Sequence, residues 1–88
     1  MEFTPSPTVQ ALAAKNHITP RAIQEITAAV TTAVNEAIQQ GAGKDEVFLA
    51  GYNVGSHILS ERGLFRERGD SSQYLGHLVR EYIAAVTK

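Results

Sequence analysis

The chain has 88 residues, of which eight are Lys or Arg, nine are Asp or Glu and none is Cys. A chain of this length forms one domain with a small core, and without cysteine it has no disulfide, thiolate metal site or cysteine nucleophile. The formal net charge of −1 argues against a nucleic-acid-binding protein, because such proteins usually carry a marked excess of positive charge.

The sequence also bears on where the protein works. The first residues contain no apolar run of the kind that a secretory signal requires. No stretch reaches the roughly 18 consecutive apolar residues that a membrane-spanning helix needs. The lack of disulfides fits an intracellular setting. We therefore expect a cytoplasmic protein that does not enter a membrane.

A short helix is predicted over residues 7–15, after a flexible start over residues 1–6. Ser6 is a residue type that caps helix N-termini well, because its side-chain oxygen can accept a free backbone N–H. Pro7 suits the first helical position, where its missing N–H costs nothing.

A second, longer helix is predicted over residues 20–40. Thr19 and Pro20 repeat the same start signal, and apolar residues then recur at helical spacing. Gly41 ends the pattern, since glycine readily adopts the left-handed conformation that closes many helices.

The third helix is predicted over residues 45–62 and contains the most informative feature of the sequence. Gly51 and Gly55 lie four residues apart within an apolar stretch, so they share one helix face. Each costs about 1 kcal/mol of helix propensity relative to alanine. We therefore expect both glycines to pack closely against a neighbouring backbone. Gly63 and Leu64 then predict a Schellman ending, in which Leu64 meets Leu59.

The last helix is predicted over residues 71–87. Asp70 and Gln73 resemble a capping box, with aspartate in place of the usual serine or threonine. The apolar positions of this helix follow helical spacing and are Leu75, Leu78, Val79, Tyr82, Ile83 and Val86. No segment shows the two-residue alternation of a strand. The sequence therefore predicts an all-α fold, a small bundle of three main helices with a short N-terminal helix.

Two His-x-x-x-Glu pairs, His57 with Glu61 and His77 with Glu81, are the only candidates for a metal site. At this spacing an imidazole and a carboxylate share a helix face and could bind zinc or iron together. Since His77 and Glu81 lie opposite the apolar stripe, we favour two ordinary polar pairs and expect no metal or cofactor.

We also expect no enzyme activity. A hydrolase would have to combine Ser56 or Ser60 with one of these histidines, and neighbours on one helix are poorly placed for that chemistry. The segment from Gly41 to Lys44 is too short for a phosphate-binding loop and lacks its following Ser or Thr.

The segment that follows the third helix is the best candidate for a partner-binding surface. It contains arginines around two apolar side chains, and arginine and aromatic residues are enriched at binding hot spots. Its residues are Arg62, Leu64, Phe65, Arg66 and Arg68. The alternative is that Leu64 and Phe65 enter the core while the arginines pair with nearby acidic residues.

The helices carry more apolar residues than a core of this size can bury, which points to self-association. The helix over 20–40 has a flank of small residues, Ala22, Ala29, Ala33 and Ala37, and Leu49 lies outside the main apolar arc of the third helix. Short chains often gain stability by forming oligomers. We expect this surface to contact a protein partner, and a second copy of the chain in particular.

Together these features predict a non-enzymatic protein–protein interaction module, a small adaptor, regulator or inhibitor that forms a homodimer through its helix faces. The alternative is a DNA-associated transcriptional regulator that uses the 62–80 region, because two helices joined by a glycine-containing turn are compatible with a helix-turn-helix. Within the last helix, only Gln73, His77 and Arg80 suit contacts to DNA.

Overall fold

The computed structural model describes residues 3–65 and 69–87 and confirms the all-α fold. Its helices are α1 (Pro7–Lys15), α2 (Pro20–Gln39), α3 (Lys44–Glu61) and α4 (Asp70–Val86). Each predicted helix is present, and each predicted end lies within one residue of the observed end. The described residues contain no strand.

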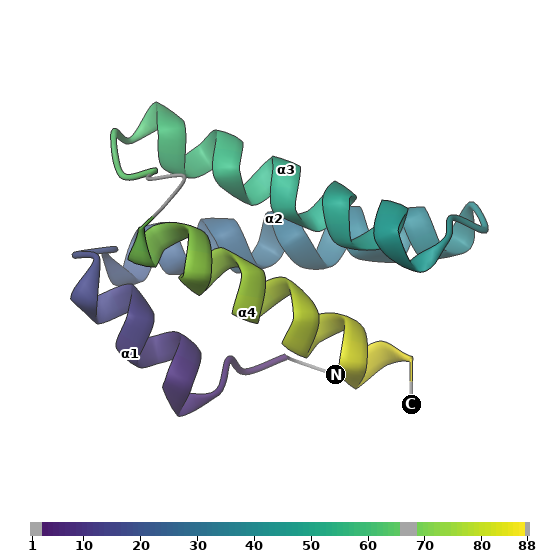
Figure 1. Cartoon of the computed structure of the whole chain (residues 1–88), viewed down its shortest axis with the longest axis horizontal. Coiled ribbons are helices and arrows are strands. Elements are labelled where there is room, and N and C mark those ends of the chain that lie inside the picture. The colour runs from purple at the N-terminus through teal and green to yellow at the C-terminus, as the bar shows by residue number, and fades with distance from the viewer. Residues whose placement is uncertain (1–2, 66–68, 88) are drawn as a thin grey trace.

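The helices form a small bundle in which α3 is the central partner of α2 and α4 (Figure 1). The pair α2 and α3 pack along their length as an antiparallel hairpin, joined by the short turn at Gly41–Gly43. The fourth helix packs on both α3 and α1, whereas α2 and α4 meet over a smaller area. The helices α2 and α4 are therefore the less tightly packed pair, and the N-terminal segment lies on this side of the bundle.

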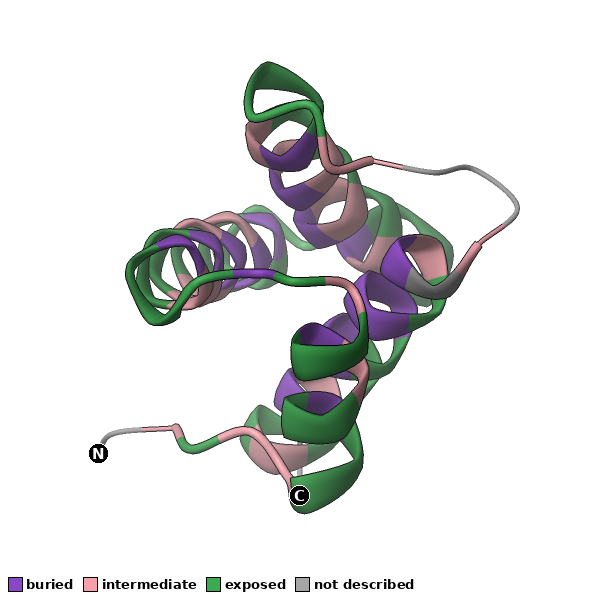
Figure 2. Ribbon diagram, turned by 90° about the vertical axis from the view of Figure 1, so that its left-hand side faces the viewer, coloured by how far each residue is buried: buried purple, intermediate pink, exposed green. Residues whose placement is uncertain are grey.

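The buried residues lie on the sides of the helices that face the middle of the bundle, and the exposed residues lie on the outward sides (Figure 2). All four helices contribute to this core, as does the linker between α1 and α2. Its apolar members are Val9, Ala13, Ile18, Ala22, Ile26, Val30, Val34, Ala37, Val47, Leu59, Tyr74, Leu75, Leu78, Val79 and Tyr82. Ala22 and Ala37 therefore belong to the core of one chain, and the expectation that they form part of an external flank is wrong.

Tyr74 is the largest side chain that is completely buried. Its hydroxyl has no hydrogen-bond partner, and this loss of hydration raises the pKa of Tyr74 to about 12. The predicted stripe of the last helix did not include Tyr74, because it stands one position before Leu75 at the edge of that stripe.

Two of the helix starts follow the predicted capping chemistry. The Val9 N–H donates to Ser6 Oγ over 3.3 Å, and the Ala22 N–H donates to Thr19 Oγ1 over 3.2 Å. At α4 the predicted capping box is wrong. Gly69 is the N-cap, and its carbonyl accepts the Gln73 N–H over 3.3 Å. Gln73 is thus one position too far into the helix to close a capping box.

Three helices end in the same Schellman geometry. After α3, Gly63 has a φ of +70°, and the Leu64 N–H donates to the Leu59 carbonyl over 2.8 Å, as predicted. Gly41 takes the equivalent position after α2 with a φ of +78°. After α1 this place is occupied by His17 with a φ of +57°, a conformation that a non-glycine residue adopts at some energetic cost.

The described part of the N-terminal segment lies against α4. The Ser6 backbone N–H and hydroxyl both donate to the Glu81 carboxylate, over 3.1 and 2.5 Å. The Phe3 ring meets the Tyr82 ring edge-on, with centroids 5.2 Å apart. These contacts attach residues 3–6 to the last helix.

Candidate functional site

Gly51 and Gly55 are both buried, and they lie where α3 contacts its neighbours. A Cβ atom at Gly51 would lie 2.9 Å from Val34 Cγ2 of α2 and 3.0 Å from Val79 Cγ1 of α4. At Gly55 it would overlap the end of the Leu75 side chain. The nearest atoms are therefore side-chain atoms, and not the neighbouring backbone that the sequence led us to expect.

Because both glycines are closely packed, α4 lies against one side of α3. Three aromatic rings, from α3 and the segment after it, form a row. The Phe48 and Tyr52 rings, one helical turn apart, stack with centroids 5.7 Å apart and an interplanar angle of 28°. Phe65, from the segment after α3, meets Tyr52 edge-on at 6.4 Å. Offset and edge-on ring pairs of this kind are mutually stabilising.

An arginine from α4 lies over the end of the row, and an exposed leucine is next to Phe48 in the sequence. The Arg80 guanidinium lies over the Phe48 ring, 5.2 Å from its centroid, which is the geometry of a cation–π contact. Leu49 follows Phe48 on the outer side of α3 and is 51% exposed. We call Phe48, Leu49, Tyr52, Phe65 and Arg80 the aromatic face.

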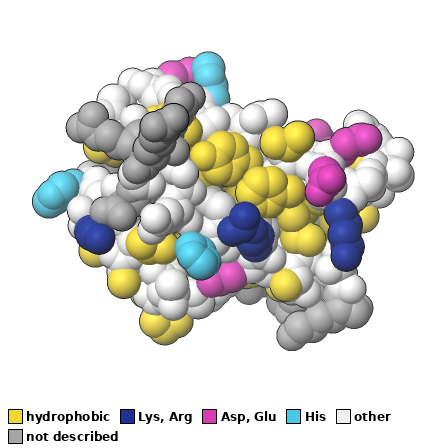
Figure 3. All heavy atoms as spheres, viewed as in Figure 1, with side chains coloured by type: hydrophobic (Ala, Val, Ile, Leu, Met, Phe, Trp, Pro, Cys, Tyr) yellow, Lys and Arg dark blue, Asp and Glu magenta, His cyan; other side chains and the backbone are white. Residues whose placement is uncertain are grey.

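The aromatic face is reached from solvent. Phe48, Tyr52 and Phe65 are half-buried, and Arg80 is exposed. Figure 3 shows hydrophobic side chains gathered where α3 and α4 pack, with Lys or Arg side chains beside them and Asp or Glu side chains farther along. Asp45, one turn before Leu49 and also exposed, contributes negative charge to this side of α3.

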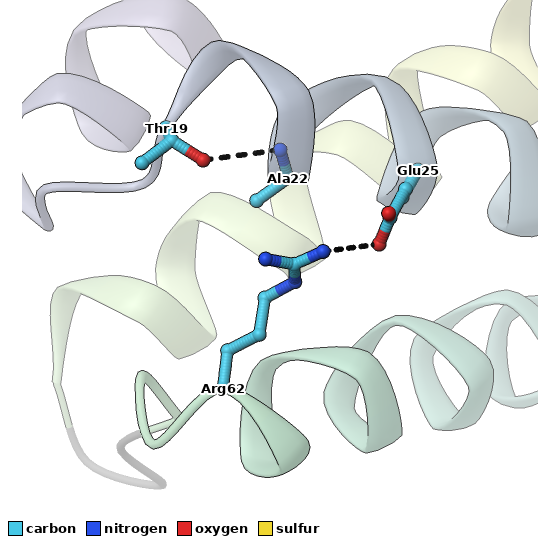
Figure 4. Close-up of polar contacts among 4 residues, drawn as sticks. All are labelled: Thr19, Ala22, Glu25 and Arg62. Atoms are coloured by element: carbon cyan, nitrogen blue, oxygen red, sulfur yellow. Dashed lines mark hydrogen bonds and ion pairs between the residues drawn. The ribbon is translucent and has the colours of Figure 1, made fainter.

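The predicted partner-binding segment is divided in the structure. Arg62 extends from the end of α3 to α2, where its Nη2 pairs with Glu25 Oε2 over 2.5 Å (Figure 4). Leu64 and Phe65 are half-buried and pack against the core cluster. Arg66 and Arg68 lie outside the described residues. Of the segment, Phe65 alone is shown to join the aromatic face.

Of the aromatic face, only Phe65 was among the predicted site residues; Leu49 was expected only as exposed apolar surface and Arg80 only as a possible DNA contact. Phe48 and Tyr52 are four residues apart, and this spacing alone could have indicated a ring pair on a helix surface. The contact of Arg80 with Phe48 had no such signal, because the two residues are far apart in the sequence and meet only through the packing of α4 on α3.

The two predicted His-x-x-x-Glu pairs have different surroundings. His57 Nε2 lies 2.7 Å from Glu61 Oε1, and both side chains are mostly exposed. In the second pair, Glu81 instead accepts the two hydrogen bonds from Ser6. Across residues 3–65 and 69–87, no group of three or more His, Cys, Asp or Glu side chains gathers as a metal site would require.

The DNA-contact alternative depended on the 62–80 region. Of its described basic side chains, Arg62 is paired with Glu25 and Arg80 lies over Phe48. His77 is exposed, as is Gln73. The arrangement thus directs these arginines to contacts within the chain.

Comparison with known proteins gives no information about the function of this chain. No family model, curated protein or solved structure matches the chain. In the described part of the chain, none of the helices combines the length and the apolar character needed to cross a membrane.

Proposed function

We propose that this chain is a non-enzymatic protein–protein interaction module that binds its partner through the aromatic face. The observation that carries the proposal is the continuous row of Phe65, Tyr52 and Phe48, with Arg80 over its end and Leu49 exposed beside it. Aromatic and arginine side chains contribute most of the binding energy in many interfaces. Here they are held by packing, so little side-chain entropy is lost when a partner covers them.

The partner that we propose is a second copy of the chain. A homodimer is usually built around a twofold axis, so one surface must be complementary to itself. The aromatic face meets this condition, because an uncharged centre is flanked by a basic residue, Arg80, and an acidic one, Asp45. A net charge of −1 also gives little repulsion between copies.

The proposed biological role is that of a small adaptor, regulator or inhibitor in the cytoplasm. The absence of cysteine favours the reducing cytoplasm.

A single charge placed on the aromatic face tests the proposal. Leu49→Glu should raise the dimer dissociation constant by about tenfold or more, because it buries a carboxylate in the interface. Size-exclusion chromatography with light scattering, over a range of concentrations, measures the change.

Val86→Glu is the matched control, since Val86 is exposed to 38% at the end of α4 and lies outside the aromatic face. It should leave the dissociation constant within about threefold of the original value. Equal weakening by both substitutions would show that the interface lies elsewhere.

A further inference from the structure

A second surface feature lies on the opposite, less tightly closed side of the bundle. A groove of about 630 Å³ runs between α2 and Tyr82 of α4, and Phe3 and Pro5 of the N-terminal segment form part of its wall. In Figure 2 the N-terminal segment passes below α2, on the side where α2 and α4 have few contacts. This volume lies within the range of about 300–1,000 Å³ that is typical of small-molecule sites.

The walls of the groove are uncharged and combine apolar with neutral polar side chains. Phe3, Pro5, Ile23, Ala28 and Tyr82 supply the apolar surface, and every other lining residue is a threonine or a carboxamide. An ionised ligand would lose its hydration in such a groove without a partner of opposite charge, which is costly. The groove therefore selects for an uncharged, largely apolar molecule.

Thr27 adds a polar anchor point within this apolar surface. Its Oγ1 is buried and has no hydrogen-bond partner, although its side chain belongs to the groove lining. Thr31, one turn later, donates its hydroxyl to the Ala28 carbonyl over 2.9 Å, and Asn35 Oδ1 accepts the Tyr82 hydroxyl over 2.9 Å. Buried polar groups are nearly always paired, so the buried hydroxyl of Thr27 is left without the partner that such a group normally has.

We propose that this groove is a binding site for an uncharged, predominantly apolar small molecule that carries one hydrogen-bonding group, and that Thr27 Oγ1 pairs with that group. Because Oγ1 is buried in the structure, this pairing requires the Thr27 side chain to rotate about χ1 and turn Oγ1 toward the groove. Phe3 and Pro5 cover one side of the ligand, held in place by the two hydrogen bonds between Ser6 and Glu81. The site is distinct from the aromatic face and does not depend on the proposed self-association.

Titration with N-phenyl-1-naphthylamine tests this site. The probe is uncharged, becomes fluorescent in apolar surroundings and has a single N–H donor for Thr27 Oγ1. The full chain should bind one probe per chain with a saturable rise in fluorescence. Ala28→Leu, at an exposed position on the groove wall, should fill the groove and weaken binding by about tenfold or more. Thr27→Val, which keeps the shape and removes the hydroxyl, should weaken binding by about threefold to tenfold.

Two controls separate this site from other apolar surface. Ala14→Leu makes the same substitution at an exposed position of α1 outside the groove and should leave binding unchanged. Leu49→Glu alters only the aromatic face and should also leave it unchanged. Failure to saturate, equal binding by the Ala28→Leu variant, or loss of binding in the Leu49→Glu variant would overturn the groove as the site. Unchanged affinity in the Thr27→Val variant would overturn the role of its hydroxyl.

Discussion

The helical glycines of this chain differ in whether there is space for a Cβ atom. At Gly51 and Gly55 the space for a Cβ is already occupied by Val34, Val79 and Leu75, which are fully buried. Gly76 of α4 is also buried, but the nearest atom that a Cβ would meet there is Arg80 Nη1 at 3.7 Å, an ordinary contact. The same substitution should therefore have opposite effects at these positions.

Alanine scanning of the three glycines tests this difference. Gly51→Ala and Gly55→Ala should each lower the free energy of unfolding by about 1–2 kcal/mol, because overpacking outweighs the gain in helix propensity. Gly76→Ala should raise it by about 0.5–1 kcal/mol. Urea denaturation followed by circular dichroism measures all three. Stabilisation by alanine at Gly51 or Gly55 would contradict the packing described for α3.

Tyr74 predicts a dependence of stability on alkaline pH. Its pKa is raised from 10 to about 12 in the folded chain by burial, so between these values the unfolded chain loses its phenolic proton first. The stabilisation is complete below pH 10 and is lost as pH rises toward 12, at up to about 1.4 kcal/mol per pH unit. Tyr74→Phe should remove this contribution to the pH dependence.

At neutral pH, Tyr74→Phe should leave stability unchanged or raise it by about 0.5–1 kcal/mol, because the buried hydroxyl it removes has no partner. Thermal unfolding of both chains at pH 7 and at pH 11 provides the comparison. An equal loss of stability at pH 11 in both chains would show that Tyr74 does not control the alkaline response.

The helix caps of α1 and α2 look alike in sequence but differ in what they hold together. Thr19 caps α2 alone, whereas Ser6 caps α1 and also binds Glu81 of α4. Thr19→Ala should cost about 1 kcal/mol. Ser6→Ala should cost more, by about 1 kcal/mol, because it also breaks a hydrogen bond to a carboxylate.

Glu81→Ala, which removes both acceptor oxygens, separates the two roles of Ser6. If the additional cost of Ser6→Ala comes from the bond to Glu81, that cost should shrink when the carboxylate is already absent. Chemical denaturation of the two single variants and the double variant gives the coupling. Strictly additive effects would show that the Ser6–Glu81 contact contributes nothing to stability.

The helices were predictable because their signals are local. Ser6–Pro7 and Thr19–Pro20 mark starts, and Gly41 and Gly63 mark ends, through chemistry confined to a few neighbouring residues. The start of α4 was misplaced because Gly69 and Asp70 are both acceptable N-caps, and the sequence alone does not decide between them.

The arrangement of side chains between helices was less predictable, because it depends on long-range packing. Leu49 was expected to be exposed from its place outside the apolar arc, and it is. The contact of Arg80 with Phe48, the pairing of Arg62 with Glu25 and the contact of Phe3 with Tyr82 each join distant parts of the chain. No spacing rule within one helix contains that information.

The molecule as a whole has two candidate surfaces on different sides of one small bundle. The aromatic face lies along α3 and α4, and the groove lies between α2, Tyr82 and the N-terminal segment. A core of this size leaves a small margin of stability, so burial of the aromatic face against a second chain would also stabilise the fold. We therefore expect the unfolding temperature to rise with protein concentration.

Sedimentation equilibrium of the unmodified chain, from about 1 μM to about 1 mM, measures self-association directly. The aromatic face predicts that the weight-average mass rises with concentration from the chain mass of 9.5 kDa toward twice that value and then stops. A mass of 9.5 kDa across the whole range would contradict the proposed homodimer, and growth beyond twice that mass would contradict an interface closed by a twofold axis.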